Sequence, residues 1–173
     1  MWKMIGSILV LTATSGAGFL YGMEQQDYLE KLLYIRHIIY MLKGELEYTK
    51  APLGEVFGRA AVRVREPYKG WLHGLERQVE RRKEDEFFKI WMRSIDRDLH
   101  TLHLKSEHVI QLKELGSCLG RMDSTSESLH YLKLYVERLE LEIEKVRESL
   151  SAKKRIGNCL GVMGGIFLIV ILI

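Results

Sequence analysis

The hydrophobic residues of this chain gather first at its two ends. Residues 4–22 and residues 156–173 carry no charged side chain. A helix needs about 20 apolar residues to cross the hydrocarbon core of a bilayer, with about 17 as the lower limit. The pattern therefore predicts a transmembrane helix at 1–23, a polar domain at 24–155 and a second transmembrane helix at 156–173.

Inside the domain, apolar residues recur every three or four positions, which is the spacing of one face of an α-helix. No stretch shows the alternation that is typical of a β-strand. We therefore expect an all-α fold, in which a six-helix bundle is flanked by an N-terminal and a C-terminal transmembrane helix. The predicted domain helices cover 24–50, 52–65, 67–79, 87–102, a segment carrying Val109 to Leu119, and a last helix that begins near Asp123.

The first and last helices of the domain both carry heptad-like seams of apolar residues. Both helices are expected to emerge from the bilayer, so we predict that they pack side by side as a stalk. The predicted contact residues are Leu32, Ile35 and Ile39 on the first helix, and Leu132, Leu139 and Ile143 on the last.

Small residues recur every four positions in both apolar ends. Such a row lets two helix backbones approach closely within lipid, where packing drives association. We expect the two rows to pack against each other or against another membrane subunit. They consist of Thr14, Gly18 and Gly22 in the first end, and of Gly157, Gly161 and Gly165 in the second.

The orientation in the membrane is predicted from charge. Lys153, Lys154 and Arg155 directly precede the second apolar end, and positive residues flank spans on the cytoplasmic side. The domain is therefore expected to face the cytosol from the cell membrane. The N-terminal segment has a second reading as a cleaved signal peptide, because Ser15-Gly16-Ala17 resembles a cleavage site.

The remaining composition excludes several function classes. The formal net charge is only +3, and acidic and basic residues interleave, so no basic stripe suited to nucleic acid is present. The two cysteines, Cys118 and Cys159, have no spacing that suggests a disulfide framework or a metal knuckle. No phosphate loop or placed nucleophile and base is found. We expect no enzymatic activity and no cofactor.

A cluster of histidines raises the hypothesis of a metal protein or an enzyme. His100 and His103 lie three residues apart, and His108 follows beside Glu107. Two histidines at this spacing can reach one zinc ion from a helix face. Because a helix break is expected near His103, we predict solvated or interfacial histidines and no metal site.

Two segments of the domain carry a resemblance to a known family. The first is Leu42-x-x-Glu45-Leu46-x-Tyr48-x-x-x-Pro52-Leu53. The second is Leu102-x-Leu104-Lys105-Ser106-Glu107, which leads into Leu112-Lys113-x-Leu115-Gly116-x-x-Leu119-Gly120-x-x-Asp123. Through these segments and its two apolar ends, the chain resembles the stage III sporulation protein AB family of endospore-forming bacteria over essentially its whole length.

The resemblance implies a component of a channel-like complex between the mother cell and the forespore. The family is similar to the cytoplasmic six-helix domain of the type II secretion F component, the inner-membrane platform protein. By that similarity, the chain would contact an assembly ATPase in the cytosol and ring-forming subunits through the membrane, and homo-oligomerisation is a further expectation. The alternative reading is a membrane-tethered sensor or adaptor that dimerises through its heptad helix.

Overall fold

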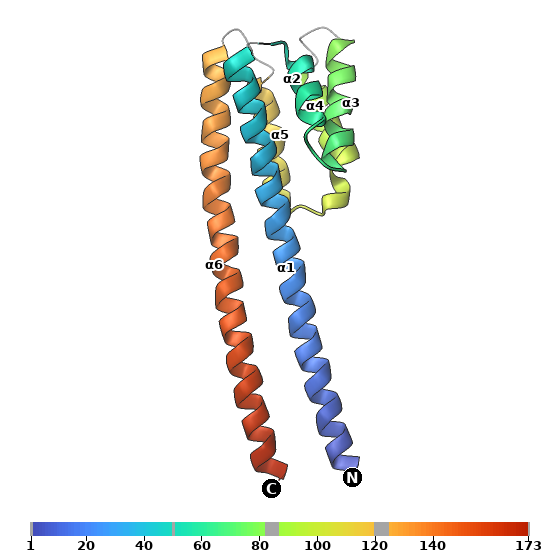
Figure 1. Ribbon diagram of the computed structural model, residues 1–173, viewed down its shortest axis with the longest axis vertical. Helices are drawn as coiled ribbons and strands as arrows, with labels where there is room; N and C mark the ends of the chain where they lie inside the picture. Colours follow the sequence, from blue (N-terminus) through green and yellow to red (C-terminus); the bar gives the residue numbers. More distant parts are fainter. Residues whose placement is uncertain (1, 50, 82–86, 120–124, 173) are drawn as a thin grey trace. The chain divides into compact units, whose positions relative to one another are not determined.

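The computed structural model describes the backbone of residues 2–49, 51–81, 87–119 and 125–172 (Figure 1). Side chains are described for residues 23–49, 51–81, 87–117, 119 and 129–152. The predicted helix start near Asp123 lies outside the described residues.

The described part of the chain is all-α, as predicted, with six α-helices, one short 3-10 helix and no strand (Figure 1). The elements are α1 (Trp2–Thr49), α2 (Leu53–Ala61), α3 (Tyr68–Glu80), α4 (Phe87–Asp98), η2 (His100–Leu102), α5 (Ser106–Leu119) and α6 (Thr125–Leu172). Helices α1 and α6 each continue without a break from the domain into an apolar end of the chain. The boundary predicted at residues 23 and 24 is therefore not a break in the helix.

Two helices end earlier than the apolar pattern indicates. Helix α4 stops at Asp98, and the backbone nitrogen of Leu102 bonds to the carbonyl of Leu99 in a 3-10 turn. Residues three apart lie on one side of such a turn, so Leu99 and Leu102 both stay buried. The apolar spacing therefore does not show that the α-helix has become a 3-10 helix. The left-handed backbone of His103, at φ 50°, then ends the turn.

Helix α2 ends at Ala61, four residues before the predicted end. The backbone nitrogen of Arg63 bonds to the carbonyl of Ala60. That of Arg65 donates instead to the hydroxyl of Tyr34 on α1, at 2.8 Å, and the Arg65 guanidinium lies 4.7 Å from the centre of the same ring. The segment after Ala61 is thus held by α1 rather than by its own helix.

The chain divides into two compact units, and each is described by itself. The first unit comprises residues 1–32 of α1 and residues 141–173 of α6. Its buried side chains, among those described, are Tyr28, Leu32, Ile143, Val146 and Leu150. An ion pair of 2.7 Å joins Lys31 to Asp27 along α1.

The second unit, residues 33–140, contains α2 to α5 with the adjoining parts of α1 and α6. Its centre is a cluster of aromatic rings, in which the Trp71 and Trp91 ring centroids lie 5.2 Å apart. Both indole nitrogens donate a hydrogen bond inside the core, Trp71 to Ser94 Oγ at 2.9 Å and Trp91 to the Leu112 carbonyl at 2.8 Å. A buried tryptophan needs such a partner for its N–H group.

The predicted seam residues of this unit are buried. Ile35, Ile39, Leu132 and Leu139 are each no more than 4% exposed. Beside them, Glu140 of α6 accepts a hydrogen bond from the Tyr40 hydroxyl of α1 at 3.1 Å and lies 3.6 Å from Arg36. Which seam residues touch one another stays a prediction.

Among the residues whose side chains are described, no helix combines the length and the apolar character needed to cross a membrane. The apolar segments 4–22 and 156–173 lie outside these residues. The same is true of the predicted small-residue rows, Thr14, Gly18, Gly22, Gly157, Gly161 and Gly165.

Candidate functional site

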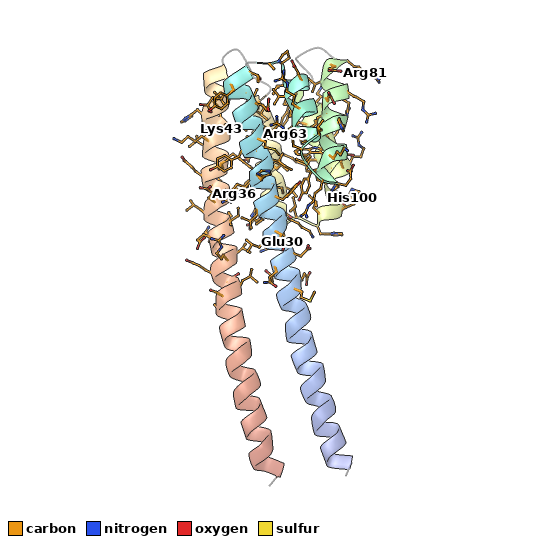
Figure 2. All side chains as sticks on the ribbon, in the orientation of Figure 1. Glu30, Arg36, Lys43, Arg63, Arg81 and His100 are labelled. Atoms are coloured by element: carbon orange, nitrogen blue, oxygen red, sulfur yellow. The ribbon has the colours of Figure 1, made fainter. Side chains whose placement is uncertain are left out.

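An open groove of about 280 Å³ lies in the second unit, beside the end of α1. Five of its lining residues come from α1 and one from the turn that follows α2. They are Met41, Gly44, Glu45, Tyr48, Thr49 and Arg63. We call this site the α1–α2 groove; Arg63, one of its lining residues, is labelled in Figure 2.

At Gly44 the backbone of α1 is not covered by a side chain. A Cβ atom built at this position would meet no atom within 4 Å. Glycine inside a helix is about 1 kcal/mol less favourable than alanine, and no neighbouring atom requires it here. The space over Gly44 is therefore open to an atom from outside the chain.

One carboxylate holds two arginines at the edge of the groove. Glu45 is only 12% exposed at its side chain, and its Oε1 lies 2.9 Å from Arg63 Nη1. Its Oε2 lies 3.6 Å from Arg59 Nη1. The Arg63 side chain is 60% exposed, so some of its five N–H donors remain available to a ligand.

The pKa of Arg59 is raised, first by its hydrogen bond to Glu55 and by the charge of that carboxylate, and then by Glu45. Both carboxylates favour the charged form of the guanidinium. The charged guanidinium of Arg59 is therefore favoured beside Glu45.

One residue that lines the groove is strongly exposed: Tyr48 is 88% exposed. Val62, the sequence neighbour of Arg63, is 75% exposed. Tyrosine and arginine are the residue types that dominate the binding energy of protein interfaces. The groove thus has the chemistry of a binding surface, with an open hollow, an exposed aromatic ring and a positioned guanidinium.

The first resemblance segment includes two residues of this groove, Glu45 and Tyr48, but the sequence did not predict a groove. Leu42 and Leu46 of the first resemblance segment are each 1% exposed, so packing explains them, whereas packing does not explain the exposed Tyr48. Arg59 and Arg63 were not predicted to be site residues. Their four-residue spacing at the end of an apolar helix was the available signal.

The histidines of the metal hypothesis do not come together. His100 and His103 are exposed, and their Nδ1 atoms bond to the carbonyls of Arg97 at 2.7 Å and Thr101 at 2.9 Å. His108 is buried in α5, at 5% exposure. In the described part of the chain, no three histidine, cysteine or acidic residues gather as a metal site requires.

Comparison with known proteins identifies the family. The family model of stage III sporulation protein AB matches residues 3–173. The chain belongs to this family. The stage III sporulation protein AB of Bacillus subtilis (strain 168) is 24% identical over 172 residues, which are 99% of each chain.

A solved structure of stage III sporulation protein AB shares the fold. It matches with a TM-score of 0.63 and 17% sequence identity, over 72% of this chain and 97% of that chain. The resemblance drawn from the two sequence segments is thus confirmed, and membership in the stage III sporulation protein AB family implies a role in sporulation.

Proposed function

We propose that the chain is a platform subunit of the channel between the mother cell and the forespore, a secretion-like complex required for endospore formation. In this proposal, residues 1–23 and 156–173 anchor the chain in the mother-cell membrane, facing the forespore. The domain lies in the cytosol and links an assembly ATPase to ring-forming membrane proteins. Family membership and the similarity to the type II secretion F component support it.

The observation that carries the proposal is the α1–α2 groove. Tyr48, which is 88% exposed, lines an open hollow, and tyrosine is one of the residue types that dominate the binding energy of protein interfaces. Arg63 offers directed hydrogen-bond donors at the same place. A subunit that joins other proteins needs such a surface.

The alternative, a sensor that dimerises through its heptad helix, is less well supported. Dimerisation through that seam requires the seam to face outward in the single chain. Leu132, Val136 and Leu139 are instead between 0% and 3% exposed in the single chain. Breaking this core to form a dimer would expose side chains worth about 1.5–3 kcal/mol each.

The test replaces the chromosomal copy with Tyr48→Ala, Arg63→Glu or the double variant, and measures heat-resistant spores. Tyr131→Ala is the matched control, because Tyr131 is also an exposed tyrosine but lies on α6. We expect the groove variants to accumulate normally and to form at least about tenfold fewer spores, since hot-spot residues contribute about 2 kcal/mol or more each. The control should sporulate normally.

A pull-down of the detergent-solubilised chain from sporulating cells identifies the partners. Recovery of an ATPase and ring proteins by the wild type, and their loss with the groove variants, would support the platform. Recovery of the chain alone would favour the sensor. Normal sporulation of the double groove variant would remove the groove from the proposal.

A further inference from the structure

A second surface of the domain carries exposed cations that form no ion pair within the described residues. Arg77 lies on α3, and Arg81 follows the last residue of that helix, four positions later. Lys89 and Arg93 lie on α4, also four positions apart. Residues four apart share one side of a helix, and all four are exposed. We call them the α3–α4 cationic face; Figure 2 labels Arg81 on this part of the domain.

The next cation along α4 lies against α3. Arg97 continues the α4 row by one further turn. Its Nη2 lies 3.2 Å from the position that a Cβ atom would have on Gly74 of α3. The missing side chain at Gly74 therefore leaves room for the Arg97 guanidinium beside α3.

The acidic residues of α3 and α4 contact residues other than the four cations of the α3–α4 cationic face. Glu76 pairs with His73 at 2.9 Å, and its carboxylate occupies the space beside Gly58 of α2. Asp96 is bound by Lys113 of α5 at 2.6 Å.

The other two acids of these helices also have contacts within the domain. The Glu80 side chain packs against Gly54 of α2, and Asp98 accepts from Arg97 at 2.7 Å. Within the described residues, none of the four cations of the α3–α4 cationic face has an ion pair. This is unlike Arg36, Arg59 and Arg63, each of which is paired.

The same chain exposes an opposite face on α5. Glu107, Ile110 and Glu114 follow one another at intervals of three and four residues, so they share one side of the helix. Ile110 is 55% exposed, and the two carboxylates have no ion pair within the described residues. The carboxylates are separated by about 10 Å along the helix axis. We call these three residues the α5 acidic face.

We propose that the α5 acidic face of one copy of this chain docks on the α3–α4 cationic face of a second copy. The carboxylates of Glu107 and Glu114 meet the exposed guanidinium and ammonium groups of the α3–α4 cationic face. Ile110 meets the apolar part of the other surface, where Phe88, beside Lys89, is 42% exposed. A contact between two different patches is heterologous, so repetition builds a ring or an open array.

This self-association does not require the ATPase or ring proteins of the proposed function. It is therefore tested with the full-length chain alone, purified in detergent. Oligomeric state is measured by light scattering after gel filtration at 50 mM and 500 mM NaCl. Exposed charges are screened over about 10 Å at 0.1 M salt, so we expect association at low salt and monomers at high salt.

Charge reversal then tests which faces meet. Arg77→Glu/Arg93→Glu reverses the cationic face, and Glu107→Arg/Glu114→Arg reverses the acidic face. We expect each variant alone to associate at least about tenfold more weakly, since like charges now face each other. An equimolar mixture of the two variants should associate again, because each reversed face then meets a face of opposite charge.

The matched control for the cationic-face variant is Lys133→Glu/Arg138→Glu, which lowers the net charge by the same amount on α6. It should associate as the wild type does. Circular dichroism checks that every variant keeps its helix content. If a reversal variant fails to fold, Lys89→Cys combined with Ile110→Cys, in a Cys118→Ser/Cys159→Ser background, should form disulfides between chains in membranes.

The proposal is supported by salt-sensitive association, its loss in both reversal variants and its return in their mixture. A wild type that stays monomeric at 50 mM NaCl would overturn it. So would a mixture that does not associate, a control that behaves like the reversal variants, or the absence of disulfides between chains. Association that persists unchanged at 500 mM NaCl would show a different interface and would equally exclude this one.

Discussion

The indole ring of Trp91 occupies the space in which a side chain on Gly116 would lie. A Cβ atom at Gly116 would overlap three atoms of this ring. The ring cannot swing aside without loss, because its N–H group donates to the Leu112 carbonyl at 2.8 Å. Gly116 thus permits α4 and α5 to approach closely, although glycine inside a helix costs about 1 kcal/mol relative to alanine.

Gly116→Ala should therefore destabilise the domain by about 1–3 kcal/mol, the usual cost of overpacking a core. Urea denaturation of the full-length chain in detergent, followed by tryptophan fluorescence, measures the change. An unchanged midpoint would mean that Trp91 finds another position without breaking its hydrogen bond.

Gly44→Ala should have the opposite effect. The added methyl group meets nothing within 4 Å, and alanine loses less conformational entropy than glycine on folding. We expect a gain of about 0.5–1 kcal/mol in the free energy of unfolding, measured by the same urea titration. A loss of stability would show that the helix around Gly44 is strained or already covered.

These two glycines show what the sequence could and could not reveal. Both lie within an apolar helical pattern, and from the sequence each is only a residue of low helix propensity. Only the structure shows that one accepts an indole ring from a helix distant in the sequence and that the other faces open space. The helix class, by contrast, follows from local periodicity, which Leu42 and Leu46 already display.

The α1–α2 groove could not be predicted for a related reason. Glu45 and Arg63 are brought together because the turn after α2 is held on α1 through Tyr34, and that contact has no periodic signature. The end of α4 was hidden because Leu99 and Leu102 stay buried through a 3-10 turn. The sequence pattern reports which residues are buried more reliably than it reports the backbone that buries them.

Leu139→Ala tests the predicted seam between α1 and α6. Leu139 is 1% exposed, and truncation of a buried leucine costs about 2–5 kcal/mol when the cavity stays open. The full-length chain in detergent should melt markedly earlier by circular dichroism. Leu141→Ala is the control on the same helix, since Leu141 is 67% exposed, and should change stability by less than about 0.5 kcal/mol. Equal melting of both variants would show that the seam does not stabilise the fold.

The orientation of the domain is tested by cysteine accessibility. Lys153, Lys154 and Arg155 motivate a cytosolic domain with both termini outside. Asp85→Cys, in a Cys118→Ser/Cys159→Ser background, should not react with a membrane-impermeant maleimide added to intact cells, and should react after lysis. Strong labelling before lysis would reverse the predicted orientation.

The small-residue rows of the apolar ends are predicted to pack together. Gly157, Gly161 and Gly165 recur every four residues, as do Thr14, Gly18 and Gly22. Their missing or short side chains permit close backbone contact within lipid, where packing drives helix association. Leucine at position 161 would separate two such helices, so Gly161→Leu should impair assembly and sporulation while the domain keeps its stability.

Disulfide cross-linking in membranes identifies the partner of this row. Gly18→Cys combined with Gly161→Cys, in a Cys118→Ser/Cys159→Ser background, should form a cross-link within one chain if the two ends form a hairpin. Cross-links only between chains would place the row at an oligomer interface instead. If no cross-link forms and Gly161→Leu sporulates normally, the glycine row has no packing role, because a leucine in a close helix contact must force the backbones apart.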